Sequence, residues 1–158
     1  KTAIFEVQAV DLRFSNGEER TYERLTPQRR SSVMVLPIHE GNLIFVREYA
    51  VGSERYELTF PKGIIDAGEE EIGFGARKIE PLRSLYSSPS HMFGLMHVFV
   101  AEDLYPSKLE GDEPEPLELV YYPLAKIDEL LASPDFAEAR NLSALFLLKA
   151  YLNKNTEK

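Results

Sequence analysis

The chain contains no cysteine among its 158 residues. That absence excludes a disulfide scaffold and thiolate metal sites, and it is compatible with a reducing cytoplasm, where we expect the protein to reside. No run of 18 consecutive apolar residues occurs, so we expect no membrane partner and no membrane-spanning helix. The longest apolar stretch, 142–148, is interrupted by Ser143 and is typical of one face of a buried helix.

Positive charge is also scarce. There are 18 Lys and Arg against 26 Asp and Glu, which gives a formal net charge of −8. A protein that binds duplex nucleic acid needs a basic face to displace counterions, so this balance argues against nucleic-acid binding. An acidic protein that acts on an anionic small molecule needs bound divalent cations or a few positioned Arg and Lys. The simpler alternative is that the charge only keeps the protein soluble.

Several common catalytic motifs are absent. There is no Gly-x-Ser-x-Gly elbow, no phosphate-binding P-loop and no dinucleotide-binding glycine fingerprint. His39, His91 and His97 lie far apart and lack metal-ligand spacing, so we assign them no role.

Segments with strand character come first along the chain, and helical segments come last. A first hairpin is predicted at 4–14 and 20–25, around the turn Ser15-Asn16-Gly17. Further strands are predicted at 33–38, 43–47, 56–60, 82–86, 95–101 and 117–122. Helical spacing occurs at 124–131 and at 141–152, and the second segment places the following residues near one stripe: Leu142, Leu145, Phe146, Lys149 and Leu152. This order predicts an α+β fold, a mixed sheet covered by helices.

The most informative segment is an acidic one, Gly-Ile-Ile-Asp-Ala-Gly-Glu-Glu-Glu-Ile-Gly-Phe at 63–74. Gly63 followed by Glu69 resembles the opening of the Nudix box, and Glu70-Glu71-Ile72-Gly73-Phe74 resembles its close. In that superfamily about eleven residues, which include the catalytic helix, lie between these two ends, whereas Glu69 and Glu70 are adjacent here. For the string alone an acidic solvated turn is the simpler interpretation, but the rest of the chain favours the resemblance.

Resemblance to Nudix hydrolases implies a carboxylate cluster that binds a hard cation, Mg²⁺ or Mn²⁺. The implied reaction is hydrolysis of a diphosphate that is linked to another group. Glu70 and Glu71 match the closing glutamate pair, so Glu71 is the strongest metal-ligand candidate and Glu70 is both a catalytic and a ligand candidate. The backbone carbonyl of Lys62 matches a further ligand of several family members, and Glu69 matches a glutamate that braces the loop.

Two other positions resemble the ADP-ribose pyrophosphatase branch of this superfamily. The segment 56–63, Tyr-Glu-Leu-Thr-Phe-Pro-Lys-Gly, resembles the strand that leads into the box, and Glu57 matches a residue that contacts the nucleotide end of the substrate. Pro89 lies sixteen positions after Gly73, the spacing that marks this branch. The alternatives are an exposed strand residue for Glu57 and an ordinary loop residue for Pro89.

The acidic loop 110–116 lies where ADP-ribose hydrolases carry a mobile loop with the catalytic base. By this resemblance Glu113 is the general base that deprotonates the attacking water, and Glu115 is an auxiliary metal ligand. Asp112 competes for either role, and a Pro-stiffened acidic surface loop is the alternative.

Several more stretches resemble the bacterial ADP compounds hydrolases, which cleave ADP-ribose, NADH and diadenosine polyphosphates to AMP and a second phosphate product. These stretches are 10–24, 47–52, 103–106, 109–116 and 139–141. One departure is that Glu48-Tyr49-Ala50 stands where many ADP-ribose hydrolases have Gln-Tyr-Arg. The arginine that contacts the pyrophosphate is then Arg47, or Arg29 or Arg30 from the segment after the hairpin.

The resemblance also implies a homodimer. It divides the chain into an N-terminal hairpin and linker at 1–30, which two copies exchange, and a Nudix domain at 31–158; an isolated two-stranded hairpin is marginal in water. If the missing box residues are a real deletion, the alternative function is that of a catalytically inactive Nudix-fold protein, either nucleotide-binding or regulatory. We favour the interpretation that the catalytic helix is disordered and was omitted from the chain. A Cα–Cα distance between Glu69 and Glu70 far above about 3.8 Å, the value for bonded neighbours, would indicate such an omission.

Overall fold

The computed structural model describes residues 2, 5–26, 31–64, 74–107 and 117–156. They form a two-stranded sheet, a seven-stranded mixed sheet, a short 3₁₀ helix and two α-helices. The strands are β1 (Val7–Arg13), β2 (Glu19–Leu25), β3 (Ser32–His39), β4 (Asn42–Ala50), β5 (Arg55–Thr59), β6 (Lys62–Ile64), β7 (Phe74–Tyr86), β8 (Leu95–Pro106) and β9 (Glu118–Pro123). The helices are η1 (Leu124–Lys126), α1 (Ile127–Ala132) and α2 (Ala139–Thr156).

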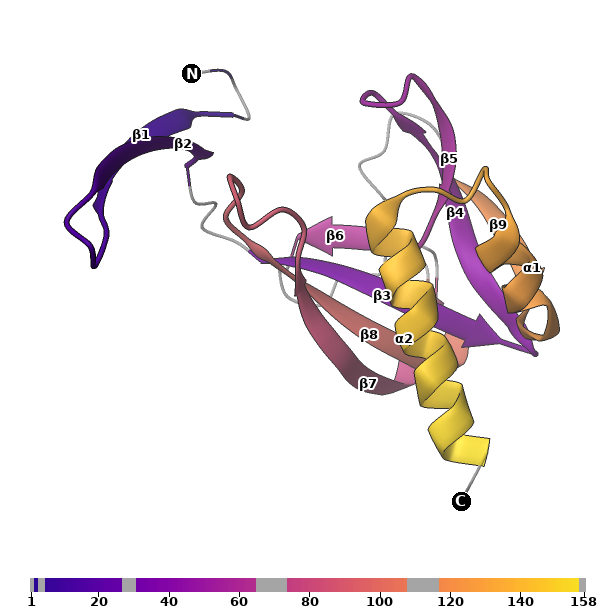
Figure 1. Ribbon diagram of the computed structural model, residues 1–158. Helices are drawn as coiled ribbons and strands as arrows, with labels where there is room; N and C mark the ends of the chain where they lie inside the picture. The colour runs from indigo at the N-terminus through magenta and orange to yellow at the C-terminus, as the bar shows by residue number, and fades with distance from the viewer. Residues whose placement is uncertain (1, 3–4, 27–30, 65–73, 108–116, 157–158) are drawn as a thin grey trace.

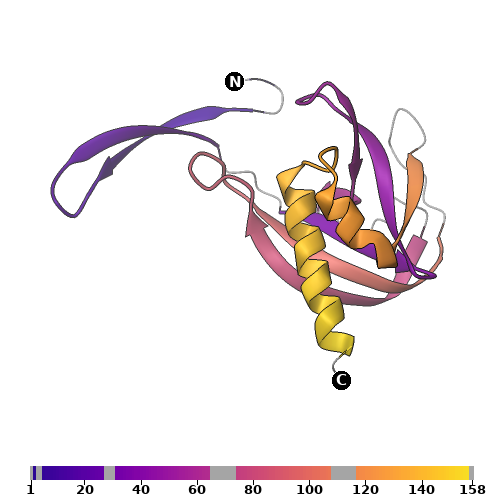
Figure 2. The same cartoon turned by 45° about the vertical axis from the view of Figure 1, so that its right-hand side comes forward.

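The large sheet has the strand order β5-β4-β3-β8-β7, with β6 paired to β3 and β9 paired to β4. Strands β3 and β8 run parallel, and the other pairs are antiparallel. Helix α2 crosses one face of the sheet over β3, β8 and β7 (Figures 1 and 2). The predicted α+β fold is therefore confirmed.

The core lies between this sheet face and the helices. Alternate residues of β8 point into it, because side chains of a strand alternate between its two faces. The fully buried set includes Met34, Leu36, Phe45, Phe60, Val98, Val100, Leu145 and Leu148. Each such side chain contributes about 1.5–3 kcal/mol by leaving water, and the ring of Phe45 contacts Phe60 at a centroid distance of 4.3 Å.

The hairpin between β3 and β4 forms at the predicted place, His39-Glu40-Gly41-Asn42. Glu40 and Gly41 have φ angles of 49° and 75°. Positive φ at both central residues matches the right-handed twist of the two strands, which is why a two-residue loop suffices here.

Strands β1 and β2 form a long hairpin that projects from the body of the molecule (Figures 1 and 2). Its contacts with the β7–β8 loop include a hydrogen bond from the Leu25 amide to the His91 carbonyl oxygen at 2.8 Å and the Arg24 guanidinium, which stacks 4.9 Å from the centre of the Phe93 ring. Its exposed large apolar residues are Phe5, Val7, Leu12, Phe14 and Tyr22. This arrangement matches the hairpin predicted within residues 1–30, while the division of the chain into two domains stays a prediction.

Two expectations about individual elements are wrong. Strands β7 and β8 extend well beyond 82–86 and 95–101, because they pair with each other from Phe74↔Pro106 to Tyr86↔Leu95. Phe146 does not belong to the buried stripe of α2, since its side chain is 60% exposed. Among the described residues, no helix is long and apolar enough to cross a membrane.

Candidate active site

A cavity of about 490 Å³ lies where β6 leads into the segment that resembles the Nudix box. It is formed by β4, β5, β6 and the beginning of α2. Its lining residues are Glu48, Tyr49, Ala50, Glu57, Thr59, Lys62, Gly63, Glu138, Arg140 and Asn141. We call this space the first cavity.

Asn141 joins α2 to the strand that leads into the box. Its side chain is completely buried, and its Oδ1 accepts hydrogen bonds from the Thr59 hydroxyl and from the Phe60 amide, both at 3.1 Å. Its Nδ2 is buried and has no hydrogen-bond partner among the residues that the structure describes. The amide thus fixes the chain two residues before Lys62.

Glu138 stands immediately before α2 and caps it. Its Oε2 accepts from the Asn141 amide at 3.0 Å, and its Oε1 accepts from the Arg140 Nε at 2.6 Å. Burial raises the pKa of the Glu138 carboxyl, but the hydrogen bonds and the charge of Arg140 together with the Asn141 amide outweigh it, so the pKa is lowered. A negative charge at this place also complements the positive end of the helix dipole.

Lys62 is half-buried in the same cavity. Burial lowers the pKa of its ammonium group, and the nearby positive charge of Arg140 lowers it further. Three carboxylates oppose this shift without cancelling it: Glu138, Glu48 and Glu57. Because the positive charge of Arg140 opposes that of Lys62, an anionic group bound between them would favour the charged form of the Lys62 ammonium group.

Glu57 lies on β5, directly opposite Glu48 of β4. Only 15% of its side chain is exposed, and the Arg55 Nε donates to its Oε1 at 2.7 Å. The hydrogen bond from Arg55 lowers the pKa of Glu57, with a further contribution from Ser53. Glu57 is therefore a charged carboxylate at the cavity wall, fixed by its ion pair with Arg55, and not a solvated strand residue.

The predicted site residues fall in different places. Lys62 and Glu57 share the first cavity, whereas Arg47 lies on the opposite face of the sheet and pairs with Glu118 at 3.3 Å. Pro89 is exposed in the β7–β8 loop and lines neither space. The remaining candidates lie outside the described residues: Arg29, Arg30, Glu69, Glu70, Glu71, Asp112, Glu113 and Glu115. The Glu69–Glu70 joint lies there too.

Within the described part of the chain no group of three or more His, Asp or Glu is placed to hold a metal ion. The first cavity nevertheless offers oxygen donors of the kind that Mg²⁺ and Mn²⁺ prefer, from Glu48, Glu57 and the Lys62 backbone. Their donor type fits a hard divalent cation. Of the four predicted ligands only Lys62 lies here, because Glu70, Glu71 and Glu115 lie outside the described residues.

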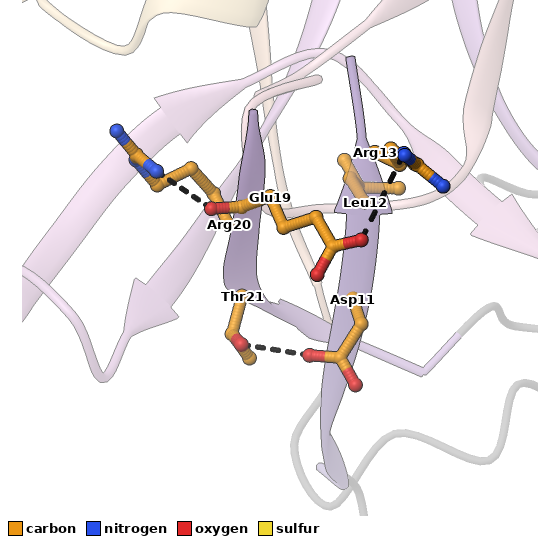
Figure 3. A pocket seen from close by; sticks show the side chains of 6 residues that line it. All are labelled: Asp11, Leu12, Arg13, Glu19, Arg20 and Thr21. Carbon is orange, nitrogen blue, oxygen red and sulfur yellow. Dashed lines mark hydrogen bonds and ion pairs between the residues drawn. The ribbon is translucent and has the colours of Figure 1, made fainter. Parts of the chain in front are cut away.

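A second kind of hollow lies on the projecting hairpin (Figure 3). It is lined by Asp11, Leu12, Arg13, Glu19, Arg20 and Thr21. The Thr21 hydroxyl donates to Asp11 at 2.7 Å, and Arg13 pairs with Glu19 at 3.8 Å. These contacts join side chains that lie opposite each other in the strand register, Asp11 with Thr21 and Arg13 with Glu19. We therefore interpret this hollow as the open surface of a hairpin and not as a reaction site.

The residues of the first cavity that were assigned no role from the sequence include Glu138, Arg140 and Asn141. The helical pattern was predicted to begin at Asn141, whereas α2 begins at Ala139. An acidic residue just before a helix is a capping signal that could have identified Glu138. No local pattern indicates that Asn141 contacts Thr59, because 82 positions separate them.

Comparisons with known proteins agree with the resemblance seen in the sequence. A family model described as the NudE-type Nudix hydrolase N-terminal domain matches residues 1–24. The ADP compounds hydrolase NudE of Escherichia coli (strain K12) is 51% identical over 163 residues, covering 96% of this chain and 88% of the relative. An ADP-ribose pyrophosphatase of Bacillus subtilis (strain 168) is 27% identical over 160 residues, covering 92% and 85%.

A solved structure supports the same relationship. The crystal structure of an ADP compounds hydrolase superposes with a TM-score of 0.92 at 49% identity, covering 98% of this chain and 90% of the other. The aligned 96% of this 158-residue chain is about 152 residues, so about eleven positions of the 163-residue alignment to the Escherichia coli protein have no residue here. The place of these positions within the box stays a prediction. The chain belongs to the NudE-type Nudix hydrolases.

Proposed function

We propose that this protein hydrolyses the pyrophosphate bond of ADP-linked compounds and releases AMP. The observation that carries the proposal is the 51% identity to an ADP compounds hydrolase over almost the whole chain. The substrates that we propose are ADP-ribose, NADH and dinucleoside polyphosphates. A catalytically inactive, nucleotide-binding Nudix protein is the disfavoured alternative.

The first cavity supplies groups suited to such a substrate. Lys62 and Arg140 both line it, and a pyrophosphate bound between two cations offsets their mutual repulsion. Arg140 already holds the Glu138 carboxylate, which orients its guanidinium. These side chains would bind and orient the substrate, and the metal would neutralise the charge that develops on the phosphates.

The metal and the base are proposed from the family resemblance. Mg²⁺ or Mn²⁺ would be held by Glu70, Glu71, Glu115 and the Lys62 carbonyl. Glu113 would accept a proton from the attacking water. Glu70 is the second catalytic candidate, besides its proposed role as a metal ligand. Glu57 would contact the nucleotide end of the substrate. Of the arginines that the resemblance offers for the pyrophosphate, Arg47 pairs with Glu118 on the opposite face of the sheet, which favours Arg29 or Arg30, and Pro89 does not line the first cavity.

The protein as it occurs would carry the box residues that are absent between Glu69 and Glu70. An intact mass about 1.3 kDa above 18.0 kDa would reveal eleven further residues of average mass. An intact mass of 18.0 kDa together with nucleotide binding and no turnover would establish the inactive alternative.

The test of the function is release of AMP from ADP-ribose with and without Mg²⁺. We expect turnover that stops when a chelator removes the metal. In Glu113→Gln we expect kcat to fall by roughly 10²–10⁴-fold, the usual contribution of a general base. Asp112→Asn is the matched control and should keep its activity. If Glu113→Gln stays fully active and Asp112→Asn loses activity instead, Asp112 is the general base.

We propose in addition a cytoplasmic homodimer in which two copies exchange the hairpin of residues 1–30. The apolar side chains exposed on the projecting hairpin support this proposal, since a second copy would cover them.

A further inference from the structure

Strands β7 and β8 bring together the ends of the two acidic segments. Strand β7 begins at Phe74, which closes the segment that resembles the Nudix box, and β8 ends at Pro106, just before the acidic loop. These two residues are partners in the strand register. Since paired residues of antiparallel strands lie about 4.5–5.5 Å apart, the box ends and the acidic loop begins within about one strand spacing of each other.

The next register pair holds an aromatic ring against a glycine. Gly75 is buried and lies opposite Tyr105. A Cβ atom at position 75 would lie 2.6 Å from the Tyr105 Cε2 and closer still to its Cζ and hydroxyl oxygen. The backbone of Gly75 is not left-handed, so its conformation is open to other residues. The ring of Tyr105 is therefore what excludes a side chain at this position.

Further contacts hold the ring in place. The Arg77 guanidinium stacks 4.9 Å from the centre of the Tyr105 ring and donates to the Asp103 carboxylate at 3.3 Å. Asp103 has a φ of 52°, a left-handed conformation that is uncommon for residues other than glycine. Such backbone outliers cluster at active sites and switch regions. This one lies two residues before Tyr105, on the strand that leads to the acidic loop.

We propose that the Tyr105 ring, packed on Gly75, is a positioning element that fixes the start of the acidic loop relative to the end of the box. The inference rests on the proposed function, in which the box supplies metal ligands and the acidic loop supplies the base, Glu113. Tyr105 is a positioning residue, because it acts through the two strand ends and not on the reacting atoms. A displacement of about 1 Å between catalytic groups lowers turnover by up to about 10²-fold.

Gly75→Ala tests the positioning in the full-length protein, because one methyl group pushes the ring away. The first cavity keeps its lining, so we expect kcat for release of AMP from ADP-ribose to fall by roughly 10–100-fold with little change in KM. Tyr105→Ala, which removes the ring, should lower kcat likewise. Adding Gly75→Ala to Tyr105→Ala should cause no further loss, because the methyl group then meets no ring. Tyr105→Phe should keep the kcat of the wild type, because its ring still packs on Gly75.

The matched control is Gly52→Ala. Nothing lies within 4 Å of a Cβ atom at position 52, and the backbone of Gly52 is not left-handed either, so kcat and Tm should stay unchanged. Thermal unfolding of every variant separates positioning from stability. If Gly75→Ala fails to fold, Tyr105→Ala and Tyr105→Phe carry the same test.

Three results would overturn the inference. The first is a Gly75→Ala variant with the kcat of the wild type. The second is a double variant in which the losses of the two single variants multiply. The third is a fall in Tm while kcat per folded molecule is unchanged, which would make the ring a purely structural contact.

Binding of Mn²⁺, measured by calorimetry, distinguishes this inference from the function. The proposed metal ligands come from both acidic segments, so Gly75→Ala should weaken Mn²⁺ binding by roughly 10–100-fold, the usual cost of disturbing groups that orient metal ligands, and Gly52→Ala should not. If the wild type binds Mn²⁺ without releasing AMP, the proposed reaction is wrong, and this difference in binding still tests the positioning. If AMP is released but Gly75→Ala matches the wild type in kcat and Mn²⁺ affinity, the reaction stands and the positioning is wrong. A wild type that neither binds Mn²⁺ nor releases AMP overturns both.

Discussion

Asn141 contributes most to the candidate site as a single residue, because one buried amide oxygen satisfies two buried donors. The Thr59 hydroxyl and the Phe60 amide both donate to it, and the Thr59 hydroxyl also lies 3.2 Å from the Phe60 carbonyl oxygen. A buried donor left without a partner costs about 1–3 kcal/mol. The position of the chain that leads to Lys62 is therefore tied to the first turn of α2.

Asn141→Ala should lower the free energy of unfolding by about 1–3 kcal/mol, because it removes both hydrogen bonds and leaves the Phe60 amide buried without its acceptor, whereas the Thr59 hydroxyl keeps the Phe60 carbonyl oxygen at 3.2 Å. Urea unfolding at neutral pH measures the loss. Ser143→Ala is the control on the same helix: its hydroxyl bonds only to the Ala139 carbonyl on the exposed side, and the expected change is within about 0.5 kcal/mol. Equal stabilities of the two variants would show that the amide does not hold this strand.

At the scale of elements, α2 is the piece that assembles the site, and its N-terminal end carries Glu138 as a cap. The carboxyl of Glu138 has a lowered pKa in the folded protein, despite the raising effect of burial, because of Arg140 and the helix amides. A carboxyl with a lowered pKa stabilises the fold at pH values above its unfolded pKa. That contribution is lost as the pH falls through the folded pKa.

Glu138→Gln should therefore destabilise the protein at pH 7 and matter progressively less below the ordinary pKa of 4.5. A cap is worth about 1 kcal/mol, which corresponds to a fall in Tm of about 2–4 °C for a domain of this size. Thermal unfolding at several pH values measures it. Glu129→Gln is the control, since Glu129 makes only a surface pair with Lys126 at 3.8 Å. A loss in Glu138→Gln that stays constant from pH 7 to pH 3.5 would contradict this account.

The elements differ in how far the sequence predicts them. The turn at Glu40-Gly41 and the strands beside it are predicted because local geometry determines them. The buried side of α2 is predicted only in part, because Phe146 is apolar but lies off the stripe that Asn141, Ala144, Leu145 and Leu148 bury. The parts of β7 and β8 that were not predicted carry Lys78 and Glu102, which pair with each other across the two strands. Because these side chains are polar, the alternating apolar pattern by which a strand is recognised in the sequence is weak there.

At the scale of the whole molecule, the α+β fold and the family follow from strand order and from the two ends of the Nudix box. The first cavity does not follow, because it joins β5 and β6 to the beginning of α2 across about half of the chain. Lys62 and Glu57 were predicted since they adjoin the box. Arg140 and Asn141 become visible only once tertiary packing places α2 over the sheet.

The projecting hairpin leads to the last prediction, which concerns assembly. Phe14 and Tyr22 contact each other edge to face at 6.3 Å, yet more than 40% of each side chain stays exposed in the single chain. If two copies exchange this hairpin, the protein sediments as a species of about 36 kDa, twice the mass of one chain.

Phe14→Glu should then shift the population toward a single chain of 18.0 kDa, because a charge would replace apolar surface that the partner covers. Phe146→Glu is the matched control, since Phe146 is an exposed phenylalanine on α2, 60% against 43% for Phe14, and its replacement should leave the dimer intact. Sedimentation velocity over a range of concentrations distinguishes the two variants. A wild-type protein that sediments only at 18.0 kDa would rule out the exchange, and dissociation by Phe146→Glu alone would move the interface to α2. Dimerisation through the hairpin would give those apolar side chains the cover that a single chain does not supply.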